Sequence, residues 1–121
     1  MRFNGICLIT KDLHRLRNFY NRVFNRNVEG DHFIKYEMNG GEFCIFTYHG
    51  MENMVPGVMD GSGYGGFTVE FEVEDVDAEY ERLKSLNVSI VKPPTTQPWG
   101  RRSVWFRDPD GNIINFYKDI E

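Results

Sequence analysis

The chain has 121 residues, which suffices for one compact domain with a substantial core, and its formal net charge is −4 with the 14 basic residues scattered along it. This pattern argues against a nucleic-acid-binding protein, and no apolar run approaches the roughly 18 residues that a membrane-spanning helix requires. With two cysteines and no secretory pattern at its start, the chain is expected to be cytoplasmic and to lack a disulfide framework.

The first half of the chain predicts a strand, a helix and then two or three strands. Residues 3–10 are apolar and rich in β-formers, and Asp12 can cap a helix whose apolar residues recur at helical spacing. Asn27 is expected at the end of this helix, because asparagine tolerates the left-handed conformation found there. The runs at 32–38 and 41–49 then predict a hairpin.

The second half repeats this order. Residues 66–73 predict a strand, after which Asp75 begins an amphipathic helix that ends at Asn87. Three further strands are predicted at 88–94, 101–107 and 112–118. The last two are joined by Asp-Pro-Asp-Gly-Asn at 108–112, a well-specified turn in which proline fixes φ and glycine permits a positive φ.

The two strand–Asp–helix–Asn–Val units lie about half the chain apart and indicate an internal duplication. We predict an α+β fold of duplicated βαβββ modules that form a curved mixed sheet with helices on the outer face. The expected boundaries within a single domain are module one at 1–48, a linker at 49–66 and module two at 67–121. The linker is rich in Gly and Met and has no helix or strand period, so it is expected to be a connection or a lid.

The paired aspartates and the ending WG-x-x-x-x-x-F-x-DPDGN at 99–112 resemble the vicinal oxygen chelate superfamily. That superfamily contains glyoxalases, extradiol dioxygenases, fosfomycin-modifying enzymes and bleomycin-resistance proteins. The resemblance covers nearly the whole chain. It supports the fold strongly and the function weakly, because one scaffold of this kind hosts many chemistries.

In the superfamily's metal-dependent members, ligands come from the start of each module's first strand and the middle of its last strand. The resemblance implies that the corresponding positions here are Gly5, Cys44, Thr68 and Asn115. Divalent Mn, Fe, Ni or Zn in such a site needs about three or more imidazole nitrogens or carboxylate oxygens, and this set contains none. We therefore expect no metal and no other cofactor, and we interpret Asn115 as a polar group lining a ligand cavity.

Side chains alternate along a strand, so the strand residues divide between two faces. The expected helix-covered residues are Ile6, Leu8, Phe43, Ile45, Val69, Phe71, Val73, Ile114 and Phe116. The opposite face mixes aromatic rings with acids and an amide, which suits a small aromatic or cationic organic molecule. The candidate ligand-binding residues are Asn115, Glu70, Tyr117, Phe46, Trp99, Trp105, Thr68 and Cys44.

Several of these residues also have structural interpretations. Trp99 and Trp105 can either stack on a ligand or pack against the chain, and Arg101 fits a solvated strand start better than an anion site. Cys7 and Cys44 are expected to be neighbouring small core thiols, because no C-x-x-C spacing supports a redox pair. The whole face can also serve as a sandwich or dimer core without any ligand.

The resemblance to metal-free members such as the bleomycin-resistance proteins implies a homodimer that binds a small molecule without altering it, as in antibiotic or metabolite sequestration. The alternative is a divergent lyase, isomerase or dioxygenase-like enzyme of the same superfamily. In that reading Glu70 or Glu42 acts as the catalytic base, or His49 completes a metal site. A purely structural or regulatory dimer is the third possibility.

Overall fold

The structure is a computed structural model that describes residues 1–63 and 66–120. It has an α+β fold with two mixed sheets, which confirms the predicted fold class. The chain divides into two compact units, Met1–Ser62 and Gly63–Glu121. Tyr64 and Gly65, at the end of the expected linker, and Glu121, at the end of module two, lie outside the described residues.

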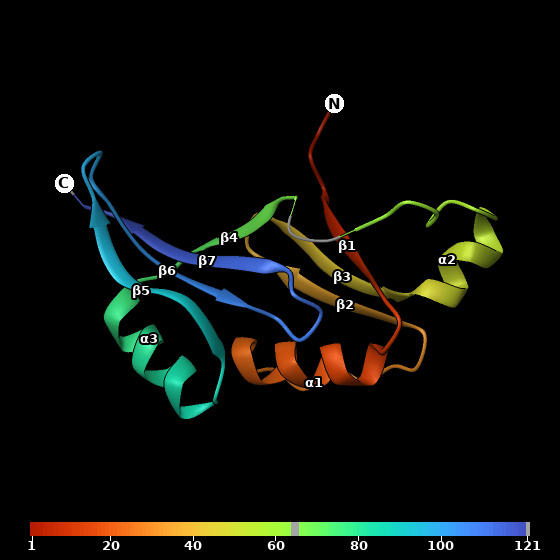
Figure 1. The fold of residues 1–121 in the computed structure, drawn as a ribbon, viewed down its shortest axis with the longest axis horizontal. Coiled ribbons are helices and arrows are strands. Elements are labelled where there is room, and N and C mark those ends of the chain that lie inside the picture. The colour runs from red at the N-terminus through yellow and green to blue at the C-terminus, as the bar shows by residue number, and fades with distance from the viewer. Residues whose placement is uncertain (64–65, 121) are drawn as a thin grey trace. The chain divides into compact units, whose positions relative to one another are not determined.

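The first unit contains a three-stranded sheet and two helices. Its elements are β1 (Gly5–Thr10), α1 (Leu13–Phe24), β2 (Phe33–Met38), β3 (Gly41–Thr47) and α2 (Tyr48–Met54). The strand order is β1-β3-β2, in which β1 runs parallel to β3 and β2 runs antiparallel to it. Helix α1 lies along one face of this sheet (Figure 1).

Helix α1 begins where the sequence predicted, because the side chain of Asp12 accepts a hydrogen bond from the Arg15 backbone N–H at 3.1 Å. Its buried residues are Leu13, Leu16, Phe19, Tyr20 and Val23. The predicted C-terminus was wrong by two residues. Asn25, with φ 54°, takes the left-handed conformation that was expected of Asn27.

Helix α2 covers the start of the segment that was predicted to have no regular structure, and it also takes Tyr48 and His49, which were wrongly predicted as the end of a strand. The side chain of Thr47 caps it by accepting a hydrogen bond from the Gly50 N–H at 2.9 Å. None of its seven residues is buried, so the sequence has no apolar stripe that would reveal a helix. The interpretation of 49–66 as an unstructured connection is therefore corrected for its first six residues.

The second unit contains a four-stranded sheet and one helix in its described residues. Its elements are β4 (Thr68–Glu72), α3 (Val76–Ser85), β5 (Ser89–Gln97), β6 (Arg101–Arg107) and β7 (Ile113–Asp119). The order is β4-β7-β6-β5, with β4 parallel to β7 and the remaining pairs antiparallel. Asp75 caps α3, and Asn87, with φ 58°, takes the left-handed conformation after it, as predicted.

Strand β5 continues to Gln97, beyond the predicted end at 94. The strand contains Pro93 and Pro94, which lack the N–H that a central strand requires. Both prolines are tolerated because β5 is an edge strand and its pairing with β6 is irregular between Lys92 and Thr95.

The duplication is visible in how each unit pairs its strands. β1 runs parallel to β3 as β4 runs parallel to β7, but the first unit has only two strands after its helix. The missing strand would follow Asn27. There the Asn21 side chain donates to the Val28 carbonyl at 3.1 Å and accepts from the Val28 N–H at 3.1 Å, so Val28 cannot offer these groups to a sheet.

The predicted division of faces is visible in the burial pattern. The fully or nearly fully buried strand residues on the helix side include Leu8, Phe43, Ile45, Ile114 and Phe116. The opposite positions in the same strands are mostly half-buried or exposed. Cys44, Ser103 and Asn115 are exceptions, because they lie on the face away from the helices and are nevertheless buried.

The turn between β6 and β7 has the geometry that its sequence predicted. Asp108 Oδ1 accepts from the backbone N–H groups of Asp110 and Asn112, each at 2.9 Å, and Gly111 has φ 90°. This turn fixes the register of the two strands and hence the partners of Asn115. No helix among the described residues is long and apolar enough to cross a membrane.

Candidate ligand-binding site

The candidate site lies on the face of the second sheet that points away from α3. Glu70 of β4, Asn115 of β7 and Trp105 of β6 are register partners across three adjacent strands. Tyr117 lies two residues beyond Asn115 and therefore shares its face. The structure thus brings together four of the predicted ligand-binding residues.

Asn115 is the most deeply buried of these four residues, with 1% of its surface exposed. Its Nδ2 donates to Glu70 Oε2 at a long distance of 3.5 Å, which orients the amide with its nitrogen toward the carboxylate. Its Oδ1 is buried and has no hydrogen-bond partner among the described residues. A buried acceptor left in this state costs about 1–3 kcal/mol, so the site retains a specific need for a donor.

Arg101 at the start of β6 links the charged groups around this amide. Its Nη1 lies 3.8 Å from Glu70 Oε1, and its Nε donates to Asp119 Oδ1 at 2.7 Å. Its guanidinium carbon also lies 3.8 Å from the centroid of the Tyr117 ring. The guanidinium is therefore already held by two carboxylates and a ring, and the local charge of Glu70, Asp119 and Arg101 together is negative.

The sequence analysis missed this role of Arg101, which it interpreted as a solvated strand start. The signal was present in the turn at 108–112. Counting equally outward from Asp110 places Arg101 opposite Asp119, as the register confirms. The basic and acidic ends of one hairpin thus predict this ion pair.

The first sheet presents the equivalent positions on its own face away from α1. Cys44 is paired with Cys7 as Asn115 is paired with Glu70, which supports the predicted correspondence of Cys44 with Asn115. Phe46 corresponds to Tyr117, and its ring contacts the Phe33 ring at a centroid distance of 6.1 Å. Cys44 is buried, but Cys7 is exposed and so is not a core thiol.

Two predicted residues lie in more open positions. Trp99 is 74% exposed and stands in the turn between β5 and β6. Thr68 is exposed at the first position of β4 and pairs with Ile113, two residues before the Glu70–Asn115 pair. Neither residue forms part of the buried group around Asn115.

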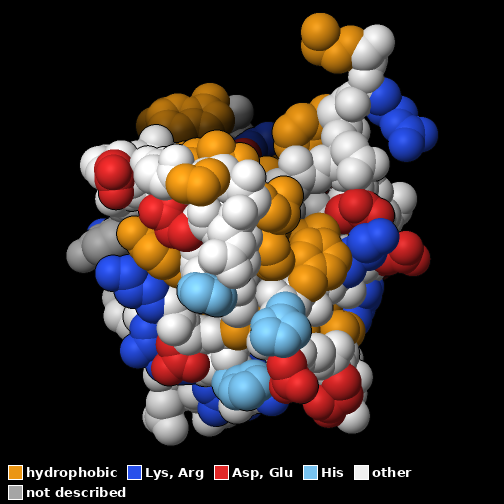
Figure 2. Space-filling model, turned by 90° about the vertical axis from the view of Figure 1, so that its right-hand side faces the viewer, with side chains coloured by type: hydrophobic (Ala, Val, Ile, Leu, Met, Phe, Trp, Pro, Cys, Tyr) orange, Lys and Arg blue, Asp and Glu red, His pale blue; other side chains and the backbone are white. Residues whose placement is uncertain are grey.

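Glu42 and His49 are the residues that the enzymatic alternative offers, besides Glu70, as a catalytic base and as a metal ligand. Glu42 lies 3.2 Å from the Lys35 ammonium and accepts a hydrogen bond from Asn4 at 3.0 Å, and both contacts lower the pKa of its carboxyl group. This carboxylate is therefore a weaker base than an ordinary glutamate. His49 is exposed on α2 with Nε2 3.2 Å from Asn53, and histidine side chains gather on the molecular face in Figure 2.

The donor set at the family's metal-ligand positions does not fit a divalent metal. The resemblance implies that these positions are Gly5 and Cys44 in the first unit and Thr68 and Asn115 in the second. A Cβ atom at position 5 would lie 2.1 Å from the Glu42 carbonyl oxygen, so the backbone there excludes any ligating side chain. Among residues 1–63 and 66–120, no group of three or more His, Cys, Asp and Glu side chains is arranged to hold a metal.

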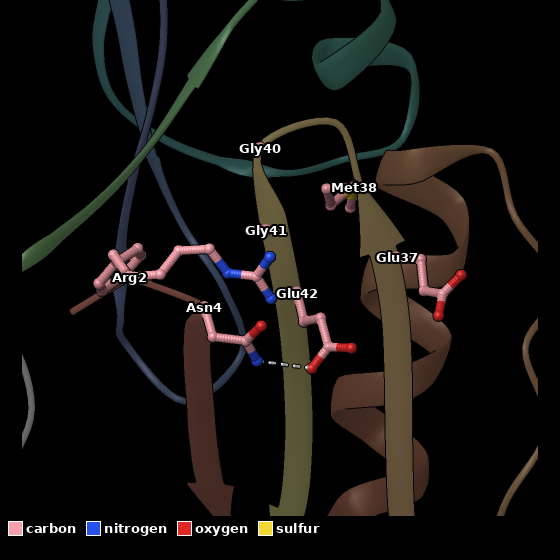
Figure 3. A pocket seen from close by; sticks show the side chains of 8 residues that line it. Arg2, Asn4, Glu37, Met38, Gly40, Gly41 and Glu42 are labelled. Atoms are coloured by element: carbon pink, nitrogen blue, oxygen red, sulfur yellow. Dashed lines mark hydrogen bonds between the residues drawn. The ribbon is translucent and has the colours of Figure 1, made fainter.

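Hollows lie elsewhere among the residues that the structure describes, and two of them are large. One, of about 490 Å³, is at the end of the first sheet beside Asn4 and Glu42 (Figure 3). The other, of about 540 Å³, lies between α3 and β5 beside Tyr80 and Arg102. Apart from Glu42, neither contains a candidate from the sequence analysis, and Arg102 in the second is held by two hydrogen bonds to Asp77 at 2.7 and 2.8 Å.

These features define a protein of two duplicated units, each with one helix-covered sheet face and an opposite face that carries polar and aromatic side chains. The chain belongs to the Glyoxalase/Bleomycin resistance protein/Dioxygenase superfamily, whose family model matches residues 2–116. The family resemblance seen in the sequence is thereby confirmed.

Similar proteins support this assignment. YraH, an uncharacterized protein of Bacillus subtilis (strain 168), is 39% identical over 61 residues, which are 50% of this chain and 48% of YraH. The chain thus spans about half of YraH. YetH, an uncharacterized protein of the same strain, is 24% identical over 116 residues, which are 90% of this chain and 91% of YetH. The solved structure of a glyoxalase-related enzyme from Fulvimarina pelagi has a TM-score of 0.81 at 25% identity, covering 96% of this chain and 86% of that one.

Proposed function

We propose that this protein binds a small aromatic or cationic organic molecule on the polar face of its second sheet, without a metal. The observation that carries the proposal is the buried Oδ1 of Asn115, which lacks a hydrogen-bond donor among the described residues. In the biological setting, this binding sequesters an antibiotic or a metabolite.

The orientation of Asn115 sets the chemistry of the ligand. Because Nδ2 points to Glu70, the free acceptor is an oxygen, and it requires an N–H or O–H group from the ligand. The Glu70 carboxylate and the negative local charge favour a donor that is also a cation. An anionic ligand would meet an Arg101 whose charge is already balanced by Asp119.

The aromatic residues supply the remaining recognition. Trp105 is partly buried and is the register partner of Asn115, so a planar ligand that reaches the amide also meets the indole. Burial of such a ring contributes most of the binding free energy, and the polar groups fix its orientation.

Three probes of similar size separate these contributions. Benzamidinium is an aromatic cation with N–H donors, trimethylanilinium is an aromatic cation without them, and benzoate is an aromatic anion. We expect Trp fluorescence to report binding in the order benzamidinium, trimethylanilinium and benzoate. Equal silence for all three probes would contradict the proposal.

Two tryptophan variants locate the signal. Trp105→Phe should remove the fluorescence change, whereas Trp99→Phe should preserve it, because Trp99 is exposed outside the buried group. A signal that depends on Trp99 alone would place binding elsewhere.

We further propose that the protein is a homodimer of one-domain subunits with the module boundaries inferred above, and that it acts in the cytoplasm. Sedimentation equilibrium should give twice the chain mass of 14.2 kDa.

The enzymatic alternative has a separate test. Turnover of a bound aromatic amine that Glu70→Gln abolishes would support it over binding alone.

A further inference from the structure

The guanidinium of Arg101 lies among the residues of the candidate site on the second sheet. Its carbon lies 3.8 Å from the centroid of the Tyr117 ring, and its Nη1 lies 3.8 Å from Glu70 Oε1. Its Nε and Nη2 donate to the two carboxylate oxygens of Asp119 at 2.7 and 3.4 Å. One aromatic ring and two carboxylates thus surround a planar cation, and the same groups recognise such cations in ligands.

The contacts of Arg101 differ in strength. Its 3.8 Å separation from Glu70 is longer than a hydrogen bond, whereas its bond to Asp119 Oδ1 is short. The side chains of Arg101 and Glu70 are also 31% and 44% exposed, and exposed ion pairs and cation–π contacts are both weak. Arg101 can therefore leave Glu70 and the Tyr117 ring while it keeps Asp119 as its partner.

The amide of Asn115 gives a ligand a reason to take the place of Arg101. Only 1% of Asn115 is exposed, so a ligand reaches its Oδ1 when a covering side chain moves. Arg101 leaves that oxygen without a donor. Because Asn115 Nδ2 lies 3.5 Å from Glu70 Oε2, the amide and the carboxylate are adjacent. A cation with several N–H groups in one plane can donate to both.

We propose that Glu70, Tyr117 and Asn115 form a subsite for a guanidinium or amidinium group of the ligand. In the free protein the guanidinium of Arg101 fills this subsite. The ligand displaces Arg101, which stays paired with Asp119. This inference rests on the binding function proposed above and names the class of its ligand.

Arg101→Met tests the displacement, because it removes the guanidinium and keeps an apolar stem. Calorimetric titration should show benzamidinium binding about 3- to 30-fold more tightly than to the unchanged protein, which is the combined strength of one exposed ion pair and one exposed cation–π contact. Arg102→Met is the matched control. It removes the same charge from the next residue, which pairs with Asp77 of α3, and should change the affinity by less than about twofold because exposed charges are screened.

Arg101→Ala separates a subsite of this shape from a general gain in negative charge. Methylguanidinium should bind the variant and raise its Tm, whereas methylammonium should have a smaller effect, because a point charge lacks the planar donor fork. The unchanged protein should respond to neither ion. In protein with ¹⁵N-labelled arginine, saturating benzamidinium should shift the Nε resonance of Arg101 and leave that of Arg102 in place.

The outcomes distinguish this inference from the function on which it rests. If neither the unchanged protein nor Arg101→Met binds benzamidinium, the proposed binding function is wrong. If the unchanged protein binds benzamidinium and Arg101→Met binds it no more tightly, Arg101 does not compete with the ligand and the inference alone is wrong. Equal binding of methylammonium and methylguanidinium to Arg101→Ala would also overturn it.

Discussion

Asn115 combines deep burial with an incomplete set of hydrogen bonds. Its side chain sits at the centre of an inner strand, where an apolar residue of similar size would satisfy packing without leaving an orphaned acceptor. The asparagine is therefore unfavourable for stability, and the binding function that we propose accounts for its presence, because functional sites commonly trade stability for function.

Asn115→Leu is the substitution that separates stability from binding. We expect it to raise the free energy of unfolding by about 1 kcal/mol, because it removes the unsatisfied oxygen and loses only a long hydrogen bond to Glu70. It should also abolish the preference for benzamidinium over trimethylanilinium. Urea denaturation and fluorescence titration measure the two effects.

Asn115→Ala is the control, because it removes the same oxygen and leaves a cavity. It should lose the probe preference and also lose stability. If Asn115→Leu destabilises the chain as much as Asn115→Ala does, the oxygen has a structural partner and the binding argument fails.

At the scale of single elements, the end of α1 offers a test of the corrected helix boundary. Asn25→Ala should lower the free energy of unfolding by about 1 kcal/mol, because a left-handed residue other than glycine or asparagine costs roughly 1–2 kcal/mol. Asn27→Ala is the matched control and should change stability by less than about 0.5 kcal/mol. Thermal and urea unfolding of both variants decide between the two boundaries.

The ion pair between Asp77 of α3 and Arg102 of β6 gives a prediction about pH. The hydrogen bond from Arg102 lowers the pKa of Asp77 below its ordinary value. A folded-state pKa below the unfolded value stabilises the fold above the unfolded pKa of about 3.9, and this stabilisation is lost as pH falls through the folded value.

Asp77→Asn should therefore lower the Tm at pH 7 and have a smaller effect at pH 2. Glu81→Gln serves as the control, because Glu81 is paired only along the helix with Lys84 in the described contacts. An equal loss of Tm for Asp77→Asn at both pH values would show that the carboxylate charge contributes nothing.

Some elements could be predicted from the sequence and others could not, because only some of them leave a periodic pattern or a turn motif in it. The face division and the β6–β7 register follow from alternation and from one turn, so the neighbours of Asn115 were predictable. Helix α2 was not, because a helix without a buried residue leaves no apolar period. The missing strand in the first unit was equally hidden, because the side chain of Asn21 occupies both backbone groups of Val28.

At the scale of the whole molecule, the two units repeat one pairing pattern with different chemistry. Where the first has Cys7 and Cys44, the second has Glu70 and Asn115. None of the four positions that the family resemblance implies for metal ligands carries an imidazole or a carboxylate. The sequence alone indicated this loss, but the orphaned oxygen of Asn115 and the closed backbone at Gly5 required coordinates.

This composition predicts that the molecule works without divalent metals. Benzamidinium affinity and Tm should stay the same, within about twofold and within about 2 °C, after dialysis against EDTA and after addition of Mn²⁺ or Ni²⁺, because no suitable ligand set exists in the described residues. A stoichiometric metal that survives dialysis in elemental analysis, or a probe that binds only with metal present, would show that the ancestral chemistry persists through ligands other than Gly5, Cys44, Thr68 and Asn115.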